Sequence, residues 1–209
     1  MRPRVKICGI TNLEDALLAA QAGADALGFI FYEKSPRSIT AENAAIIIRQ
    51  LPPFITPVGV FVNADREFID TTIERTGIRA IQLSGDESPA ECNGYPVSVI
   101  KSFRIRRGEE VEAVRHFTIS AAMLDGAKDG QYGGSGTVPD FTIAAEIRKF
   151  HPLILAGGLN PENIVEAVHA TRPYAVDVNS GIETRPGKKD PAMLRLLFQR
   201  LGSLPPHKS

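Results

Sequence analysis

The sequence predicts an α/β fold, a single-domain (β/α)8 TIM barrel, on three observations. Short runs rich in β-branched and aromatic residues alternate with helix-like stretches along the whole chain, which is the pattern of βα units around a parallel sheet. Eight such runs occur, and most are nearly continuous in apolar residues, as strands buried on both faces are. With 209 residues, the chain allows about 26 residues for each unit, which is compact for this barrel.

Each strand is expected where an apolar run lies between turn-forming residues. The eight expected strands are residues 5–8, 26–31, 57–62, 80–83, 97–102, 121–125, 153–156 and 174–178.

Helices are expected between these strands, and several have recognisable start signals. Asn12, Thr40 and Asp65 can each cap the helix that follows with a side-chain oxygen. Later in the chain, Asn160 and Asp190 each precede a proline, a residue that favours the first position of a helix. The expected fourth helix, "SPAECNGY" at 88–95, has the weakest helical pattern.

The chain is expected to form one domain over residues 1–203, followed by a frayed C-terminal tail at 204–209, because no linker or low-complexity stretch divides it. A doubly wound open sheet is the rival architecture. That fold would need a glycine-rich dinucleotide turn after its first strand, and "CGITNLED" lacks the G-x-G-x-x-G spacing.

The composition argues against several classes of function. Lys and Arg total 24 and Asp and Glu total 24, so there is no basic surface for nucleic acid in the overall charge. Cys8 and Cys92 are too few for a disulfide scaffold and, like the four scattered histidines, lack metal-ligand spacing. Without an apolar run long enough for a membrane or a signal peptide, a cytoplasmic protein with no membrane partner is expected.

In a (β/α)8 barrel, function lies at the C-terminal ends of the strands and in the loops after them. Cys8 ends the first strand, and Asp125 ends the sixth, before the glycine-rich loop "GAKDGQYGGSG" at 126–136, which we expect to act as a lid. The two side chains can face each other across the mouth as base and acid. The N-terminus of the helix after Asn12 can favour the thiolate. From the residues alone, Cys8 as a buried packing residue stays open.

The last two turns are typical of a phosphate site. In many barrels the loops after strands seven and eight hold a phosphate through backbone N–H groups, to which glycine gives close access. The turns "AGGLNPEN" and "DVNSGIE" fit this role, and they contribute Gly157, Gly158, Asn179, Ser180 and Gly181. A phosphorylated small molecule is therefore the expected ligand.

The loop after the second strand carries Arg37 in "YEKSPRS". A guanidinium at this end of the barrel can hold a carboxylate through two parallel hydrogen bonds. Taken alone, Arg37 can equally be a solvated loop residue.

Motifs along nearly the whole chain resemble those of the phosphoribosylanthranilate isomerase family of tryptophan biosynthesis. They are "KICGIT", "GADALGFIFYEKSPRSIT", "VGVFVN", "QLSGDE", "YGGSG", "AGGLNPENI" and "YAVDVNSGIE", in this order. The resemblance implies a (β/α)8 barrel that carries out an Amadori rearrangement of N-(5'-phosphoribosyl)anthranilate without metal or cofactor. A small phosphoribosyl substrate is the implied partner, and a monomer or homodimer is expected.

The resemblance also implies roles for individual residues. Cys8 matches the general base, Asp125 the general acid, and Arg37 the residue that binds the anthranilate carboxylate. Asp177 in "VDV" matches a position near the site, where it is expected to contact substrate. The phosphate is assigned to the turns that hold Gly157, Gly158, Ser180 and Gly181.

One departure from the family pattern lies after the fourth strand. The family commonly has "QLHG" there, whereas this chain has "QLSG", with Ser84 in place of histidine. Ser84 can still donate a hydrogen bond to substrate but cannot carry a charge, so we expect altered binding and intact chemistry.

Three other functions remain alternatives from the sequence. A related barrel isomerase of histidine biosynthesis uses an aspartate where Cys8 stands. A Schiff-base lyase or aldolase would use Lys6 or Lys101 as its nucleophile. A non-catalytic phosphosugar-binding protein is the third alternative, for which Ser84 is the one indication.

Overall fold

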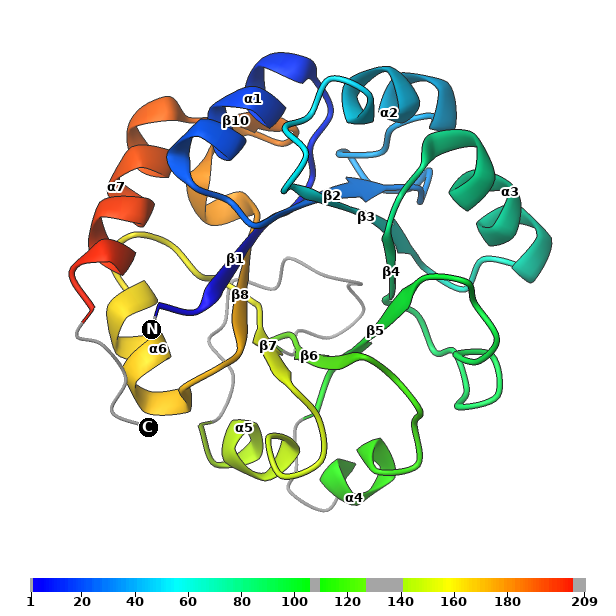
Figure 1. Ribbon diagram of the computed structural model, residues 1–209. Coiled ribbons are helices and arrows are strands. Elements are labelled where there is room, and N and C mark those ends of the chain that lie inside the picture. Colours follow the sequence, from blue (N-terminus) through cyan, green and yellow to red (C-terminus); the bar gives the residue numbers. More distant parts are fainter. Residues whose placement is uncertain (1, 106–109, 127–140, 205–209) are drawn as a thin grey trace.

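Eight parallel strands close into a barrel in the computed structural model, which describes residues 2–105, 110–126 and 141–204 (Figure 1). The strands are β1 (Arg4–Ile7), β2 (Ala26–Ile30), β3 (Thr56–Phe61), β4 (Ala80–Leu83), β5 (Ser98–Phe103), β6 (Ala121–Leu124), β7 (Leu153–Leu155) and β8 (Ala175–Val178). Each strand pairs in parallel with the next along the chain, and β8 pairs with β1 to close the ring. The predicted fold class is confirmed.

Helices form a ring outside the barrel (Figure 1). They are α1 (Leu13–Ala22), α2 (Ala41–Ile48), α3 (Arg66–Thr76), α4 (Val111–Val114), α5 (Phe141–Ile147), α6 (Ile164–Thr171) and α7 (Pro191–Gly202). After β8 the chain adds a 3₁₀ helix, η2 (Ser180–Ile182), and a hairpin of β9 (Glu183–Arg185) and β10 (Lys188–Lys189). No helix in the described part of the chain is long and apolar enough to cross a membrane.

Four of the expected capping residues do cap their helices. Asn12 accepts a hydrogen bond from the N–H of Asp15 at 2.9 Å, and Thr40 and Asp65 act in the same way on α2 and α3. Asp190 accepts from the N–H groups of Ala192 and Met193 at the start of α7. These local signals therefore set where the helices begin.

Asn160 does not cap α6, which begins at Ile164. Its Oδ1 instead accepts from the N–H of Glu162 at 2.8 Å and of Asn163 at 3.1 Å, within the turn before the helix. The expected helix start at Pro161, directly after Asn160, was therefore wrong, because the Asn160 side chain stabilises an extra turn between β7 and α6.

The expected fourth helix is absent, since residues 84–97 are all described and form turns. Ser88 and Glu91 make the reciprocal hydrogen bonds of a capping box, and Cys92 N–H bonds the carbonyl of Ser88. The chain then reaches Gly94, which has φ +74°, and Pro96. Both residues disfavour continuation, so the helix start signal yields only a single turn.

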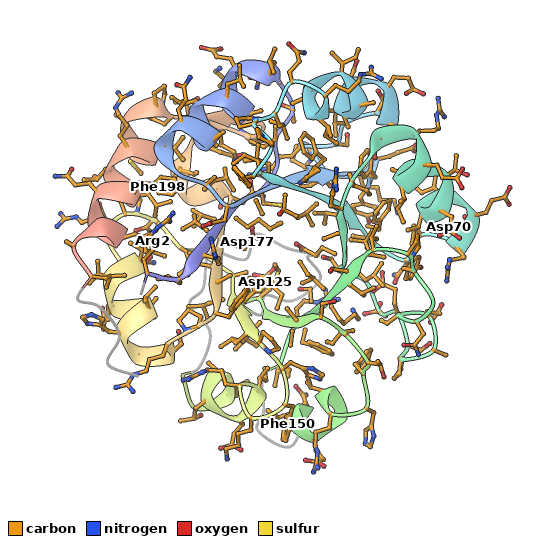
Figure 2. All side chains as sticks on the ribbon, in the orientation of Figure 1. Arg2, Asp70, Asp125, Phe150, Asp177 and Phe198 are labelled. Atoms are coloured by element: carbon orange, nitrogen blue, oxygen red, sulfur yellow. The ribbon has the colours of Figure 1, made fainter. Side chains whose placement is uncertain are left out.

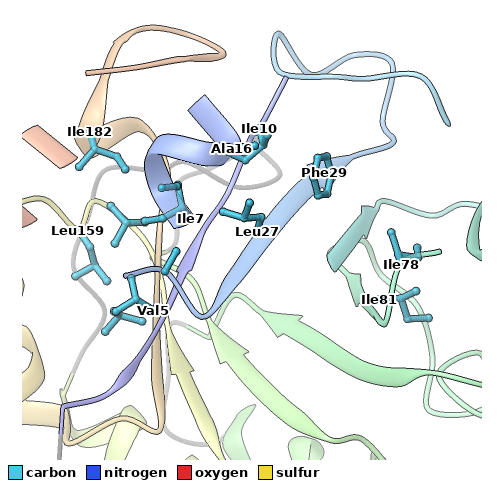
Figure 3. Packing of buried hydrophobic residues seen from close by; sticks show 14 of the residues in the cluster. Val5, Ile7, Ile10, Ala16, Leu27, Phe29, Ile78, Ile81, Leu159 and Ile182 are labelled. Atoms are coloured by element: carbon cyan, nitrogen blue, oxygen red, sulfur yellow. The ribbon is translucent and has the colours of Figure 1, made fainter. Parts of the chain in front are cut away.

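Apolar side chains form one cluster inside the barrel and a second, larger cluster between the barrel and its outer helices. Inside the barrel lies a cluster of Val58, Ala80, Ile100, Ala121, Met123, Ile154, Ala156 and Ala175. Outside it, Val5 and Ile7 of β1 and Leu27 of β2 lie in a larger buried cluster with Ala16 of α1 (Figure 3). Since alternate residues of a strand point to opposite faces, Lys6 and Cys8 face the interior.

The expected domain bounds, 1–203 and 204–209, stay a prediction. Helix α7 ends at Gly202, and Leu204 still contacts the outer apolar cluster. Residues 205–209 lie outside the described part of the chain.

Candidate active site

A cavity of about 430 Å³ opens at the C-terminal mouth of the barrel. Nine of the ten predicted site residues line it: Cys8, Arg37, Ser84, Asp125, Gly157, Gly158, Asp177, Asn179 and Ser180. The tenth, Gly181, does not. A Cβ at Gly181 would lie 2.0 Å from the carbonyl oxygen of Leu159, so this glycine allows η2 to pack against the turn after β7.

Lys6 and Asp177 form a buried ion pair next to this cavity, which Asp177 lines. The two residues are paired in the register of β1 and β8, and Lys6 Nζ lies 2.8 Å from Asp177 Oδ1. Burial is the largest single influence and favours the neutral amine, but the charges and hydrogen bonds of Asp177 and Cys8 together outweigh it and raise the pKa of Lys6. Lys6 therefore stays cationic.

Cys8 lies beside this ion pair and is 4% exposed. A Cβ on Gly28 of β2 would lie 2.8 Å from Cys8 Sγ and 3.0 Å from Lys6 Nζ, so the glycine makes room for both groups. Burial raises the pKa of the Cys8 thiol above its ordinary value, while the charges of Lys6 and Lys189 oppose the rise. In the free protein Cys8 is therefore a thiol held next to positive charge.

The positive charge near Cys8 comes from Lys6 and Lys189, which the sequence did not indicate for this role. The sequence pointed to the helix after Asn12 as the source of this effect, and to Lys6 only as a Schiff-base nucleophile. Strand alternation, which puts residues 6 and 8 on the same face, was the signal that could have revealed Lys6. No comparable local signal points to Lys189, which is 181 residues from Cys8.

Asp125 follows the end of β6 and is 8% exposed. Burial, and then the negative charge of Asp177, raise the pKa of Asp125 to about 6. Among the described residues, its Oδ1 has no hydrogen-bond partner. A carboxyl group in this setting is protonated in part of the molecules close to neutral pH, far more often than an ordinary aspartate, and can donate its proton into the cavity. Figure 2 shows Asp125 and Asp177 near the centre of the ring of strands. The expected lid after Asp125, apart from Gly126, lies outside the described residues.

Arg37 reaches the site from the loop after β2 and is held by Glu183, at the start of β9. Its Nε lies 3.0 Å from both carboxylate oxygens of Glu183, and its Nη2 lies 2.7 Å from Oε2. Gly9, with φ +72°, makes this path possible, since a Cβ there would lie 2.8 Å from Arg37 Cδ. Arg37 thus lines the cavity with its guanidinium held by an ion pair, and its role in binding stays a prediction.

The turn after β7 exposes backbone donors to the same cavity. Gly157 has φ +91° and Gly158 has φ +60°, in the left-handed region that favours glycine. Asn163 Nδ2 donates to the carbonyl of Gly158 at 2.9 Å and fixes the turn. Within the described part of the chain, the N–H groups of Gly157 and Gly158 donate no hydrogen bond. No described residue therefore competes with an anion for these two N–H groups.

Ser84 lies at the end of β4 beside Gln82. Gln82 Nε2 donates to Ser84 Oγ at 3.0 Å, so the serine hydroxyl accepts from glutamine and keeps its own proton to donate. Both residues line the cavity.

Together, the barrel and this cavity define a class: (β/α)8-barrel enzymes that carry out acid–base chemistry at the C-terminal mouth. The family model described as N-(5'-phosphoribosyl)anthranilate (PRA) isomerase matches residues 5–200 of the chain. The chain therefore belongs to the N-(5'-phosphoribosyl)anthranilate isomerase family. The family, the fold and the isomerase function expected from the sequence are confirmed.

Individual relatives agree with this assignment. The N-(5'-phosphoribosyl)anthranilate isomerase of Geobacter sulfurreducens is 50% identical over 197 residues, which cover 94% of this chain and 97% of that protein. The crystal structure of phosphoribosyl anthranilate isomerase from Thermotoga maritima is 41% identical with a TM-score of 0.88, and the match covers 97% of this chain and 100% of that one. A further structure of this isomerase, at 40% identity and a TM-score of 0.85 with the same coverage, contains reduced 1-(o-carboxyphenylamino)-1-deoxyribulose 5-phosphate.

Proposed function

We propose that this isomerase acts on N-(5'-phosphoribosyl)anthranilate, with Asp125 as general acid and Cys8 as general base. The product is 1-(2-carboxyphenylamino)-1-deoxyribulose 5-phosphate. The observation that carries the assignment is Asp125: a buried carboxyl with a pKa of about 6 and an unpartnered oxygen lines the same cavity as a thiol. Such a pair supplies one proton donor and one proton acceptor to a single substrate.

The first step opens the sugar ring. Asp125, in its protonated form, donates a proton to the furanose ring oxygen while the lone pair of the substrate nitrogen forms a C=N bond. The bond between C1' and the ring oxygen breaks, and the product is an open-chain iminium cation. The raised pKa of Asp125 favours the protonated form that this step requires.

In the second step Cys8 removes the proton from C2'. The electrons of the C–H bond flow toward the iminium nitrogen, which gives a neutral enolamine. Protonation at C1' and loss of the hydroxyl proton at C2' then give the ketone, so the overall change is an isomerisation. Because burial raises the pKa of Cys8, the thiolate needs additional positive charge, and the iminium supplies it. The base therefore becomes competent after the ring has opened.

The remaining site residues bind the substrate. Arg37 holds the anthranilate carboxylate, and Ser84 donates a hydrogen bond from its hydroxyl group. Asp177 holds Lys6 in place and faces the sugar. The phosphate binds to backbone N–H groups at Gly157, Gly158, Asn179 and Ser180, while Gly181 contributes by packing the second turn against the first.

Neither lysine considered for Schiff-base chemistry is a free amine. Lys6 is paired with Asp177. Lys101 is 4% exposed, lies 3.0 Å from Glu87 and donates to the carbonyls of Gly85 and Ser102. A nucleophilic lysine has to be neutral and accessible to the substrate, so these contacts favour acid–base isomerisation.

The function is tested with the fluorescence of anthranilate compounds. We expect the purified protein to consume freshly prepared N-(5'-phosphoribosyl)anthranilate with saturable kinetics and with undiminished rate after treatment with EDTA. Absence of turnover would contradict the proposed function, and loss of activity with EDTA would contradict the expectation of catalysis without metal.

The state of assembly and the cellular location also remain proposals. One Thermotoga maritima structure is of monomers obtained from a dimeric phosphoribosylanthranilate isomerase. For this chain we propose a monomer or a homodimer, which sedimentation equilibrium will distinguish, and a cytoplasmic location.

A further inference from the structure

Glu183 joins the carboxylate-binding arginine to a second, fully buried cation. Its Oε2 accepts from Arg37 Nη2 at 2.7 Å, and its Oε1 accepts from Lys189 Nζ at 2.9 Å. The side chain of Glu183 is 3% exposed and that of Lys189 is 0% exposed. Burial tends to raise the pKa of Glu183, but Arg37 and Lys189 outweigh it and lower the value, so Glu183 is an anion.

The contact with Glu183 uses only one edge of the Arg37 guanidinium. That edge consists of Nε and Nη2, whereas Nη1 makes no hydrogen bond within the described residues. The guanidinium presents its N–H donors as a planar fork, so fixing one edge also fixes the direction of the other. Since Arg37 lines the cavity, the edge of Nη1 and Nη2 remains for a second carboxylate.

Lys189 connects this pair to the rest of the site. Its Nζ lies 2.5 Å from the carbonyl oxygen of Cys8 and 3.0 Å from Asn179 Oδ1. Burial lowers the pKa of Lys189, and the charge of Glu183 opposes this shift. With Lys189 protonated in its ion pair, the cluster of Arg37, Glu183 and Lys189 contains two cations and one anion and carries one net positive charge. This charge matches one substrate carboxylate.

We propose that Glu183 is a positioning residue that makes the enzyme selective for a substrate bearing a carboxylate. It holds Arg37 by one edge and thereby presents the other edge to the substrate before binding. The inference rests on the proposed function, which gives Arg37 the anthranilate carboxylate. Without Glu183, Arg37 has to be ordered during binding, and the substrate loses affinity.

The test compares two substrates, N-(5'-phosphoribosyl)anthranilate and the carboxylate-free N-(5'-phosphoribosyl)aniline. For Glu183→Gln we expect KM for the first substrate to rise about tenfold, the order of the entropy cost of holding a long side chain, with little change in kcat. KM for the second substrate should stay the same. In an Arg37→Ala background, Glu183→Gln should cause no further loss of selectivity.

Glu87→Gln is the matched control. Glu87 is a buried glutamate that also lies next to a lysine, with Oε2 3.0 Å from Lys101 Nζ, but its hydrogen bonds and ion pair within the described residues do not involve Arg37. A general effect of removing a buried carboxylate would appear in both variants. The preference for the carboxylate-bearing substrate should fall only in Glu183→Gln.

The outcomes separate this inference from the function on which it rests. Absence of turnover by the wild-type protein would contradict the proposed function. Normal turnover, with selectivity lost in Arg37→Ala but kept in Glu183→Gln, would overturn the positioning role alone. If Glu183→Gln does not fold, Glu183→Gln/Lys189→Met removes both charges of the buried pair without leaving one unpaired. The same loss of selectivity is expected in this variant, and retained selectivity would overturn the inference.

Discussion

Lys6 and Asp177, paired 2.8 Å apart inside the barrel, act on the proposed acid and base at the same time. The charge of Lys6 lowers the pKa of both Cys8 and Asp125, and the charge of Asp177 raises both. The two effects oppose each other, so burial is the largest influence on each group. This ion pair therefore keeps a cation beside the thiol while the pKa of Asp125 stays near 6, so that part of the Asp125 population is protonated as the pH approaches neutrality.

Removing either charge of the Lys6–Asp177 pair should shift the pKa of Cys8 and the pKa of Asp125 in the same direction, and the two removals should have opposite effects. We expect Lys6→Met to raise the pKa of Cys8 and Asp177→Asn to lower it, because each removes one charge of known sign. The measurement is the pH dependence of Cys8 alkylation in a Cys92→Ser background. The background variant leaves Cys8 as the one cysteine that can be alkylated. Cys92 is replaced because burial raises its pKa to about 11, and its titration at alkaline pH would overlap that of Cys8. Shifts of the same sign in both variants would contradict this account of the charges.

Cys8→Ser should abolish proton abstraction while keeping the shape of the site. A hydroxyl group does not ionise near neutral pH, so we expect kcat to fall by about 10²–10⁴-fold with little change in KM. Steady-state kinetics on the fluorescent substrate measure both constants. Near wild-type kcat would return Cys8 to the role of a packing residue.

Asp125→Asn should block ring opening instead of C–H cleavage. We expect a loss of kcat of about 10²–10⁴-fold, because the amide cannot donate an acidic proton. With substrate deuterated at C2', the residual activity of Asp125→Asn should show a smaller isotope effect than that of Cys8→Ser. An isotope effect in the reverse order would mean that base and acid are exchanged.

Asp125→Asn should also make the folded protein more stable at alkaline pH. The pKa of Asp125 rises from its ordinary value of 3.8 to about 6 on folding, so the folded state binds the proton more tightly. The resulting stability is present below about pH 4 and is lost as pH rises through about 6. Relative to wild type, the variant should gain up to about 3 kcal/mol in free energy of unfolding at pH 8, and much less at pH 4. Urea unfolding at the two pH values provides the test, and an equal difference at both would refute the raised pKa.

Gly158→Asp should weaken binding of the phosphate group. The substitution places a negative charge beside backbone N–H groups that we assign to an anion. Gly158→Asn is the control, because asparagine has nearly the same shape and tolerates the φ of +60° at this position. We expect inorganic phosphate to inhibit the aspartate variant much less than the asparagine variant. Equal inhibition in the two would place the phosphate elsewhere.

The sequence by itself determined the barrel and the positions of its proposed acid and base. Runs of apolar residues marked the eight strands, and side chains such as Asn12 and Asp190 marked where helices begin. These signals are local, since a cap or a periodic stripe acts within a few residues of the same segment. Once the fold is a (β/α)8 barrel, residues at strand ends such as Cys8 and Asp125 lie at one mouth.

Only the tertiary structure decided which charges these residues meet. Glu183 pairs with Arg37 across 146 positions of the chain, and Lys6 pairs with Asp177 across 171. The pKa of Asp125 also depends on its burial, which follows from barrel closure. Ion pairs and desolvation arise from distances between remote segments, and no pattern within one segment encodes them. The charges around the thiol of Cys8 and the guanidinium of Arg37 therefore depend on the contacts that β8 and the hairpin after it make with β1 and the loop after β2.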